Sequence, residues 1–146
     1  MNESTFVDVN IVMYAAGAEH PNRQACQAAL NRIVNEEQPA AVSSEVHQEI
    51  LHRYLSLGLP DKARQVSIRL ETLIPTILPV TIADIRRART LSERYPALTA
   101  RDLIHVAVMV ENGLSCILST DAHFDQVSEV KRLDPRDFAS GEPDST

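Results

Sequence analysis

The sequence predicts an α/β fold in which helices cover a mostly parallel sheet. Short apolar or alternating runs, typical of strands, alternate along the chain with longer runs of helical periodicity. No tight hairpin signal, such as Asn-Gly between two alternating runs, joins neighbouring strands. The chain has 146 residues and is 44% hydrophobic, which suffices for one domain with a substantial core.

In the first half of the chain, single residues mark where helices begin and end. Gly17 ends a short helical run, and Pro21 and Pro60 each suit the first turn of a helix. Ser43 or Ser44 suits a helix cap. The predicted order is a strand at 4–8, helices at 11–16 and 21–37, a strand at 40–43, and helices at 44–58 and 59–73.

Prolines and capping boxes mark the second half. Pro75 and Pro79 place the strand candidate at 76–80 at a sheet edge, because proline cannot donate a ladder hydrogen bond. Capping boxes at 81–84 and 99–102 each open a helix. The predicted order is a strand at 76–80, helices at 82–94 and 100–112, a strand at 115–119, a short helix at 122–127 and a strand at 130–133.

Composition and charge limit the possible functions. A net charge of -6 argues against a protein that simply coats nucleic acid. From 52 to 101, however, nine basic residues accompany four acids, which makes this segment +5. Ordinary solvated helix faces explain that segment equally well.

The sequence indicates a cytoplasmic protein. It has no run of about 18 apolar residues, the length that spans a membrane. The N-terminus lacks the basic and apolar regions of a signal peptide. Cys26 and Cys116 suit buried thiols in a reducing compartment. We expect one domain at 1–138 and fraying of the small polar residues at 139–146.

Four acids follow the predicted strands. Asp8 and Asp121 stand where strand-like runs stop, Asp102 opens a helix, and Glu49 lies shortly after a strand. The carboxyl ends of parallel strands are neighbours, so these carboxylates would repel one another unless a cation neutralised them. The pattern predicts a site for a hard metal ion, which typically serves phosphate chemistry. Helix caps and turns remain the alternative explanation for each acid.

Other polar residues are candidates for supporting roles. Glu45 stands four residues before Glu49 on the same helix face, and we expect one of the two to reach the site. Asn10 and His105 are candidates to support the acids. The spacing of the histidines matches no familiar zinc motif.

Several short motifs follow one another along the chain. They are TFVDVN at 5–10, EIL at 49–51, RDLIHVA at 101–107, LSTDAHFD at 118–125 and the ending RLDP at 132–135. Through these motifs the chain resembles the PIN domain family over about residues 4–138. Each motif alone is weak, whereas four in order at ordinary spacing are fairly specific.

The resemblance implies a PIN-like three-layer sandwich and a nuclease site that binds one or two Mg²⁺ or Mn²⁺ ions. Transferred to this sequence, the catalytic and metal-binding acids are Asp8, Glu49, Asp102 and Asp121, with Asn10, Thr120 and Asp125 in support. Small chains of this kind resemble the VapC-like toxins of type II toxin–antitoxin pairs. That likeness implies a structured RNA target, transfer or ribosomal, an antitoxin protein as partner, and a homodimer.

The expected activity is metal-dependent hydrolysis of RNA phosphodiesters. Arginine forks suit phosphate, and the candidates to hold phosphates flanking the cleaved bond are Arg86, Arg87, Arg89 and Arg101. A housekeeping RNA-processing nuclease and a PIN-like module that binds RNA or protein without cleavage remain alternatives. A phosphatase of the haloacid type is disfavoured, because Asn10 stands where its second aspartate belongs.

Overall fold

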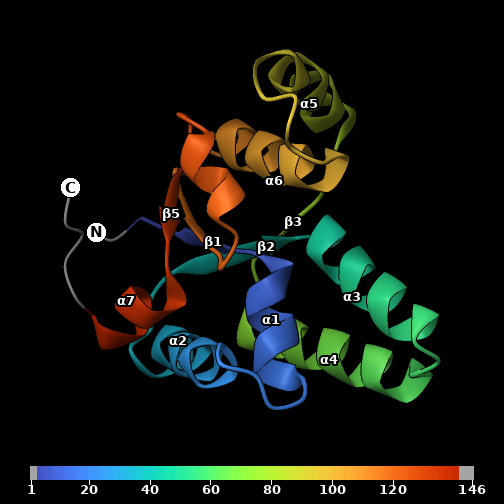
Figure 1. Cartoon of the computed structure of the whole chain (residues 1–146), viewed down its shortest axis with the longest axis vertical. Coiled ribbons are helices and arrows are strands. Elements are labelled where there is room, and N and C mark those ends of the chain that lie inside the picture. The colour runs from blue at the N-terminus through green and yellow to red at the C-terminus, as the bar shows by residue number, and fades with distance from the viewer. Residues whose placement is uncertain (1–2, 142–146) are drawn as a thin grey trace.

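The computed structural model describes residues 3–141, whose strands form one five-stranded sheet with every described pair parallel (Figure 1). The strands are β1 (Thr5–Val7), β2 (Ala40–Ser43), β3 (Ile77–Leu78), β4 (Cys116–Leu118) and β5 (Lys131–Leu133). Their order across the sheet is β3-β2-β1-β4-β5. The predicted α/β class is confirmed, and the strand order, which the sequence leaves open, places β1 at the centre.

Helices cover both faces of the sheet and complete the expected three layers. The helices are α1 (Val9–Ala16), α2 (Arg23–Asn35), α3 (Ser44–Ser56), α4 (Pro60–Leu73), α5 (Ile82–Arg94), α6 (Ala100–Glu111), the 3₁₀ helix η1 (Ala122–Gln126) and α7 (Pro135–Ser140). In Figure 1, α5 and α6 lie on one side of the sheet, and α1, α2, α4 and α7 lie on the other. Helix α3 packs on α4 and also contacts α1 and α6.

The core lies on both sides of the central strands. Phe6 and Val7 of β1 and Ile117 and Leu118 of β4 are completely buried, as expected for parallel strands covered on both faces. Each such side chain stabilises the fold by about 1.5–3 kcal/mol relative to an exposed one. These short strands therefore hold their carboxyl ends rigidly in place.

Several helices differ from the prediction. Helix α1 begins at Val9 rather than at residue 11, and α3 ends at Ser56 rather than at residue 58. Helix α2 begins at Arg23, because Pro21 lies in a preceding turn where the Asn22 backbone N–H donates to Nδ1 of His20 at 3.1 Å. Helix α7 was not expected. Asp134 caps it by accepting from the Arg136 backbone N–H at 2.9 Å, and Phe138 is buried against the core.

The structure places the first residues of the expected polar tail in a helix. Ala139 and Ser140 belong to α7 rather than to a frayed end at 139–146. Residues 142–146 of that expected tail lie outside the described residues. Among residues 3–141, no helix is long and apolar enough to cross a membrane.

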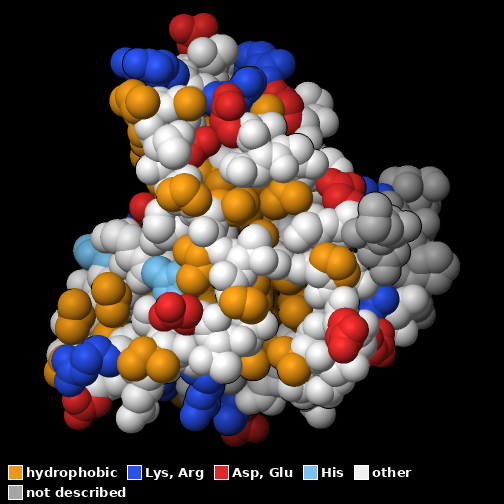
Figure 2. Space-filling view, turned by 180° about the vertical axis from the view of Figure 1, so that it is seen from behind, with side chains coloured by type: hydrophobic (Ala, Val, Ile, Leu, Met, Phe, Trp, Pro, Cys, Tyr) orange, Lys and Arg blue, Asp and Glu red, His pale blue; other side chains and the backbone are white. Residues whose placement is uncertain are grey.

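Several large hydrophobic side chains reach the surface in the described part. Leu51 and Leu55 lie on α3, and Leu57 and Leu59 lie in the turn that joins α3 to α4. Figure 2 shows hydrophobic side chains spread across the middle of one face, with charged groups gathered towards its upper and lower ends. Such surfaces often form contacts with other proteins. The homodimer expected from the family resemblance stays a prediction.

Candidate active site

The sheet reverses its direction of growth between β1 and β4. From β1 the chain adds β2 and β3 on one side, and it then returns to add β4 and β5 on the other. Such a switch point opens a crevice at the carboxyl ends of the two strands, where ligands bind in open α/β sheets. Asp8 follows β1 directly, and Ser119 follows β4 directly.

Asp8 caps α1 and is almost fully buried, with 5% of its surface exposed. One carboxylate oxygen accepts a hydrogen bond from the Val9 backbone N–H at 2.8 Å. The other accepts from the Ser119 hydroxyl at 2.7 Å and from the Asn10 side-chain amide at 3.1 Å. The helix cap that offered a purely structural explanation of Asp8 is therefore present, and the side chains of Ser119 and Asn10 hold the second oxygen in place.

Burial makes the negative charge of Asp8 costly. It raises the pKa of the Asp8 carboxyl from 3.8 to about 6, although the hydrogen bond from Ser119 opposes this shift. The charge on Asp121 raises this pKa further, and Arg101 lowers it. A cation beside Asp8 would favour the charged form.

Glu49 is the second acid of the site. It lies on α3 with 2% of its side chain exposed, and its carboxylate forms an ion pair with Nε of Arg101 at 2.9 Å. Glu45, one turn earlier, does not line the cavity that Glu49 lines. Burial raises the pKa of Glu45, Arg101 lowers it and Glu49 raises it again. The geometry therefore favours Glu49 over Glu45 as the site acid.

Asp102 and Asp121 complete the acidic set, each at the start of a helix. Asp102 forms the expected capping box with Thr99, whose hydroxyl accepts from the Asp102 backbone N–H at 3.2 Å. Asp121 caps η1 by accepting from the His123 backbone N–H at 2.9 Å. Ligand atoms of Asp102, Asp121 and His123 all lie within 4.8 Å of one another. Each aspartate therefore serves as a cap while presenting its carboxylate to its neighbours.

One cavity of about 590 Å³ brings the predicted acids together. Its lining includes all four of them, namely Asp8, Glu49, Asp102 and Asp121. Asn10 and His105 line it as well, and three cationic side chains complete its charged wall, namely Arg53, Lys62 and Arg101. The sequence did not single out Arg53 and Lys62.

His105 is buried behind the acids. Its Nε2 lies 3.7 Å from an Asp8 oxygen, and neither ring nitrogen has a hydrogen-bond partner among residues 3–141. Burial lowers the pKa of His105 to about 4. The charge on Asp102 opposes this shift, and the charge on Arg101 adds to it. The ring packs on Phe6 with centroids 5.3 Å apart. His105 is thus a neutral packing group and is poorly suited to act as a general base at neutral pH.

Ser119 connects the supporting groups, although the sequence analysis did not select it. Besides donating to Asp8, its hydroxyl accepts from the Asn10 amide at 3.2 Å and from the Asp121 backbone N–H at 3.0 Å. The Asn10 amide oxygen accepts from the Thr120 backbone N–H at 3.3 Å. Thr120 thus supports the site through its backbone. The position of Ser119 at the carboxyl end of β4 was the available signal.

Among the described residues, Asp125 contacts the site only through Arg132. It accepts two hydrogen bonds from the Arg132 guanidinium, at 2.9 and 3.2 Å, and it does not line the cavity. Arg132 also donates to the Ser119 carbonyl at 3.1 Å. The pair therefore fixes the end of β4 rather than presenting a carboxylate to a ligand.

Three of the four predicted phosphate-binding arginines lie elsewhere. Arg86, Arg87 and Arg89 belong to α5, and none of them lines the cavity. Arg87 instead pairs with Glu111 of α6 at 2.6 Å. Helix α5 carries these arginines and lies on the outer side of α6, away from the sheet (Figure 1). Arg101 alone of the four reaches the acids.

The donor chemistry of this cavity fits a divalent metal ion. Carboxylate oxygens are the preferred ligands of hard cations such as Mg²⁺ and Mn²⁺. Asp8 and Glu49 are both buried, so a cation there would offset charges that water cannot reach. His123 is an exposed side chain that pairs with Asp121 at 3.0 Å, and it adds an imidazole nitrogen at the rim.

Sequence comparisons place this chain in a known family. The PIN domain model matches residues 5–130. Ribonuclease VapC13 of Mycobacterium tuberculosis is 33% identical over 127 residues, which cover 87% of this chain and 97% of the relative. Ribonuclease VapC23 of the same species is 35% identical over 116 residues, which cover 80% and 91%.

Solved structures share the fold at lower sequence identity. VapC20 of M. tuberculosis, described as a toxin that cleaves the sarcin-ricin loop, has a TM-score of 0.70 at 19% identity and covers 86% of this chain and 95% of its own. VapBC2 of Rickettsia felis, bound to a promoter DNA fragment, has a TM-score of 0.69 at 13% identity, with coverage of 88% and 96%. The chain therefore belongs to the PIN domain family, and within it to the VapC ribonucleases.

Proposed function

We propose that this chain is a metal-dependent endoribonuclease that acts as the toxin of a type II toxin–antitoxin pair. The observation that carries the proposal is the meeting of Asp8, Glu49, Asp102 and Asp121 in one cavity at the switch point of the sheet. The four acids come from positions far apart in the sequence and from different elements. Capping accounts for the three aspartates, whereas Glu49 lies buried inside α3 and caps no helix.

The acids and the cations of the cavity would take different parts in the expected chemistry. The four carboxylates would hold one or two Mg²⁺ or Mn²⁺ ions, and Ser119 and Asn10 orient Asp8. Such an ion would supply a hydroxide nucleophile near neutral pH and offset charge on the phosphate. Arg53, Lys62 and Arg101 line the same cavity, and Arg101 pairs with Glu49.

These cations suit the binding of the substrate. Their guanidinium and ammonium groups would contact phosphates beside the scissile bond. Asp8 and Glu49 are almost fully buried, and interactions between charges are stronger in such surroundings than in water. Burial lowers the pKa of His105, which leaves activation of water to the acids. Hydrolysis would leave a 5′-phosphate and a free 3′-hydroxyl.

The partners of this chain follow from its relatives. One solved structure with the same fold is a toxin–antitoxin complex from Klebsiella pneumoniae, with a TM-score of 0.65 at 17% identity. This similarity, with the VapC relatives, supports an antitoxin protein as partner and a structured RNA, transfer or ribosomal, as target. A homodimer and a cytoplasmic location complete the proposal. A housekeeping nuclease would lack the antitoxin, and a non-cleaving module would lack turnover.

RNA cleavage by the purified protein tests the catalytic part. We expect total RNA to be cut with Mg²⁺ or Mn²⁺ and left intact with EDTA. Asp8→Asn should abolish cleavage while the protein stays folded, because the amide removes a charged metal ligand. Asp61→Asn is the matched control, since Asp61 is an exposed acid on α4 that pairs with Arg64. Full metal-dependent activity of Asp8→Asn would contradict the assignment.

Manganese binding and growth assays separate the alternatives. Calorimetry should show Mn²⁺ binding by the unsubstituted protein and much weaker binding by Asp8→Asn. Mn²⁺ binding without cleavage of any RNA would favour the non-cleaving module. Expression in a bacterial host should arrest growth, and co-expression of the product of the adjacent gene should relieve the arrest. Growth without arrest, together with cleavage in vitro, would favour the housekeeping nuclease.

A further inference from the structure

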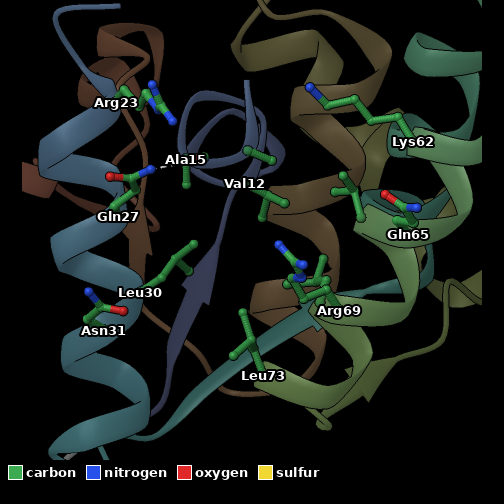
Figure 3. Close-up of a pocket in the computed structure, with 13 residues that line it drawn as sticks. Val12, Ala15, Arg23, Gln27, Leu30, Asn31, Lys62, Gln65, Arg69 and Leu73 are labelled. Carbon is green, nitrogen blue, oxygen red and sulfur yellow. Dashed lines mark hydrogen bonds between the residues drawn. The ribbon is translucent and has the colours of Figure 1, made fainter. Parts of the chain in front are cut away.

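Helix α1 presents two different sides to its surroundings. Val12 and Ala15 line a cavity of about 720 Å³ between α2 and α4 (Figure 3). Asn10 and Tyr14 instead line the cavity that contains the four acids. These two residues are four positions apart, which places them on one helix face about 6 Å apart along the axis. Because the Asn10 amide donates to Asp8 at 3.1 Å, Tyr14 lies one helical turn beyond a group that holds a site acid.

Tyr14 is the accessible aromatic side chain of the acidic cavity. The chain has three tyrosines, three phenylalanines and no tryptophan. Among residues 3–141, Tyr14 and Tyr54 are the two of these that line the cavity. Tyr54 is only 4% exposed, and the Lys62 ammonium lies over its ring at 5.3 Å. Tyr14 packs partly against the core and is half-buried, so it remains available to a ligand in the cavity.

A second ring supports Tyr14. The His20 imidazole stacks on the Tyr14 ring, with centroids 4.4 Å apart and planes inclined by 30°. The Asn22 backbone N–H donates to Nδ1 of His20 at 3.1 Å, which fixes the orientation of the imidazole. We call these two rings the Tyr14–His20 pair. A ring that is already held in place loses less conformational freedom when a ligand stacks on it.

A close turn at Gly17 brings His20 back to Tyr14. Gly17 ends α1, and its backbone N–H donates to the Tyr14 carbonyl at 3.4 Å. A Cβ at this position would lie 2.8 Å from the Met13 carbonyl oxygen, which is closer than real side chains approach. The turn that stacks the two rings therefore depends on the absence of a side chain at Gly17.

The hydroxyl of Tyr14 is not used by the fold. Within residues 3–141 it makes no hydrogen bond. Tyr95 differs, since it lies outside the cavity, donates to Glu129 at 2.6 Å and accepts from the Ser128 backbone N–H at 3.1 Å. A supported ring with an unpaired hydroxyl suits a flat ligand that has polar edges.

The parts of a nucleotide match the parts of this cavity. Its acids suit a metal ion and its cations suit phosphates, whereas an uncharged base needs an aromatic face. Proteins that recognise single-stranded RNA commonly stack unpaired bases on aromatic side chains. A base is joined to its phosphate through one sugar, so a ring one helical turn from the acids is suitably placed for it.

We propose that the Tyr14–His20 pair stacks on the nucleobase next to the scissile phosphodiester and positions the RNA for cleavage. The base leaves the RNA stack and lies against the pair, and the Tyr14 hydroxyl bonds to a base edge or to a sugar hydroxyl. The inference rests on the proposed ribonuclease function. Phosphates are the same in every nucleotide, so this pair adds a requirement for an unpaired base beside the cleaved bond.

Binding of two labelled oligomers tests this proposal by fluorescence anisotropy in the Asp8→Asn background, which prevents cleavage. One is a short oligoadenylate, and the other has the same number of phosphates but abasic nucleotides. Tyr14→Ala should bind the oligoadenylate roughly 5- to 150-fold more weakly and the abasic oligomer with unchanged affinity. The slope of log affinity against log salt should stay the same, because the substitution removes no charge.

Further variants separate stacking from packing. Tyr14→Phe keeps the ring and should retain most of the affinity for oligoadenylate, whereas Tyr14→Leu keeps apolar bulk without an aromatic face and should lose it. His20→Ala should weaken binding less than Tyr14→Ala, because it removes only the support. Tyr95→Ala is the matched control outside the cavity and should leave the affinity unchanged. With Asp8 intact, Tyr14→Ala should bind Mn²⁺ like the unsubstituted protein in calorimetry.

Each other outcome overturns the inference in a distinguishable way. If Tyr14→Ala binds both oligomers like its parent, no base stacks on Tyr14, while cleavage of total RNA keeps the ribonuclease assignment. If Tyr14→Leu binds like its parent, or if Tyr14→Ala weakens both oligomers equally or weakens Mn²⁺ binding, Tyr14 only shapes the cavity. If the unsubstituted protein does not cleave total RNA and the Asp8→Asn protein binds neither oligomer, the proposed function fails together with the inference.

Discussion

Replacing Arg101 with methionine removes the one positive partner that the structure gives to Glu49. The two side chains are 2.9 Å apart, and 44% of the Arg101 side chain is exposed against 2% of Glu49. Methionine keeps much of the apolar stem of arginine and deletes only the charged end. The Glu49 carboxylate is then left buried with neither water nor a cation to compensate it.

The size of the effect follows from this burial. Removing one partner of a fully buried ion pair costs about 3–5 kcal/mol. Water screens the exposed side of Arg101, so we expect a loss of about 2 kcal/mol in the free energy of unfolding. For a chain of this size, that loss lowers the melting temperature by roughly 4–8 °C.

A double-mutant cycle measured by thermal and urea unfolding, without metal, provides the assay. Glu49→Gln removes the buried charge, so the double variant should be about as stable as Glu49→Gln alone, with a coupling energy of about 2 kcal/mol. Arg53→Met is the control, because Arg53 lines the same cavity without a carboxylate partner in the described residues. Added Mn²⁺ should recover part of the stability that Arg101→Met loses.

Two results would refute the reasoning. An Arg101→Met variant that melts with the parent would mean that Glu49 does not depend on this arginine. Strictly additive effects of the two substitutions would mean that the pair has no interaction of its own.

Three smaller predictions concern single residues. Ser119→Ala should lower the free energy of unfolding by about 1–3 kcal/mol and weaken Mn²⁺ binding, because the buried Ser119 hydroxyl donates a hydrogen bond to Asp8. An unchanged Mn²⁺ affinity in calorimetry would contradict this prediction. Arg87→Gln should leave RNA cleavage intact and change the free energy of unfolding by less than about 1 kcal/mol. Loss of cleavage would instead indicate that Arg87 contacts the RNA. Burial lowers the pKa of His47 below 6.5, so His47 binds a proton more readily in the unfolded chain, and the free energy of unfolding should fall as pH falls. His47→Gln should make this pH dependence less steep. The same slope of unfolding free energy against pH in both proteins between pH 7 and pH 5 would contradict this prediction.

Local chemistry explains what the sequence could predict. The boxes that begin with Thr81 and Thr99 place α5 and α6 correctly, because a cap depends on residues only three positions apart. The three aspartates were identifiable because each follows a strand or stands at a helix start, whereas Glu49 lies inside α3. Helix α7 could have been found by the same logic, since Asp134 before Pro135 is an ordinary helix start.

Long-range packing explains what the sequence could not predict. Ser119 bonds to Asp8 across 111 positions, and this contact exists only because β4 pairs with β1. Strand order depends on the packing of all the helices and leaves no local trace. Likewise, Lys62 reaches the acids because α4 turns back along α3, while the richer arginine cluster on α5 points elsewhere.

The distribution of the four acids along the chain also has a consequence for synthesis. Asp121 follows β4, and β4 must pair with β1 before the acids from residues 8 to 121 can meet. No partial chain that lacks β4 can assemble the site, and parallel pairing over such sequence distances is intrinsically slow. A ribosome that makes this protein must therefore synthesise nearly the whole chain before the acidic site can form.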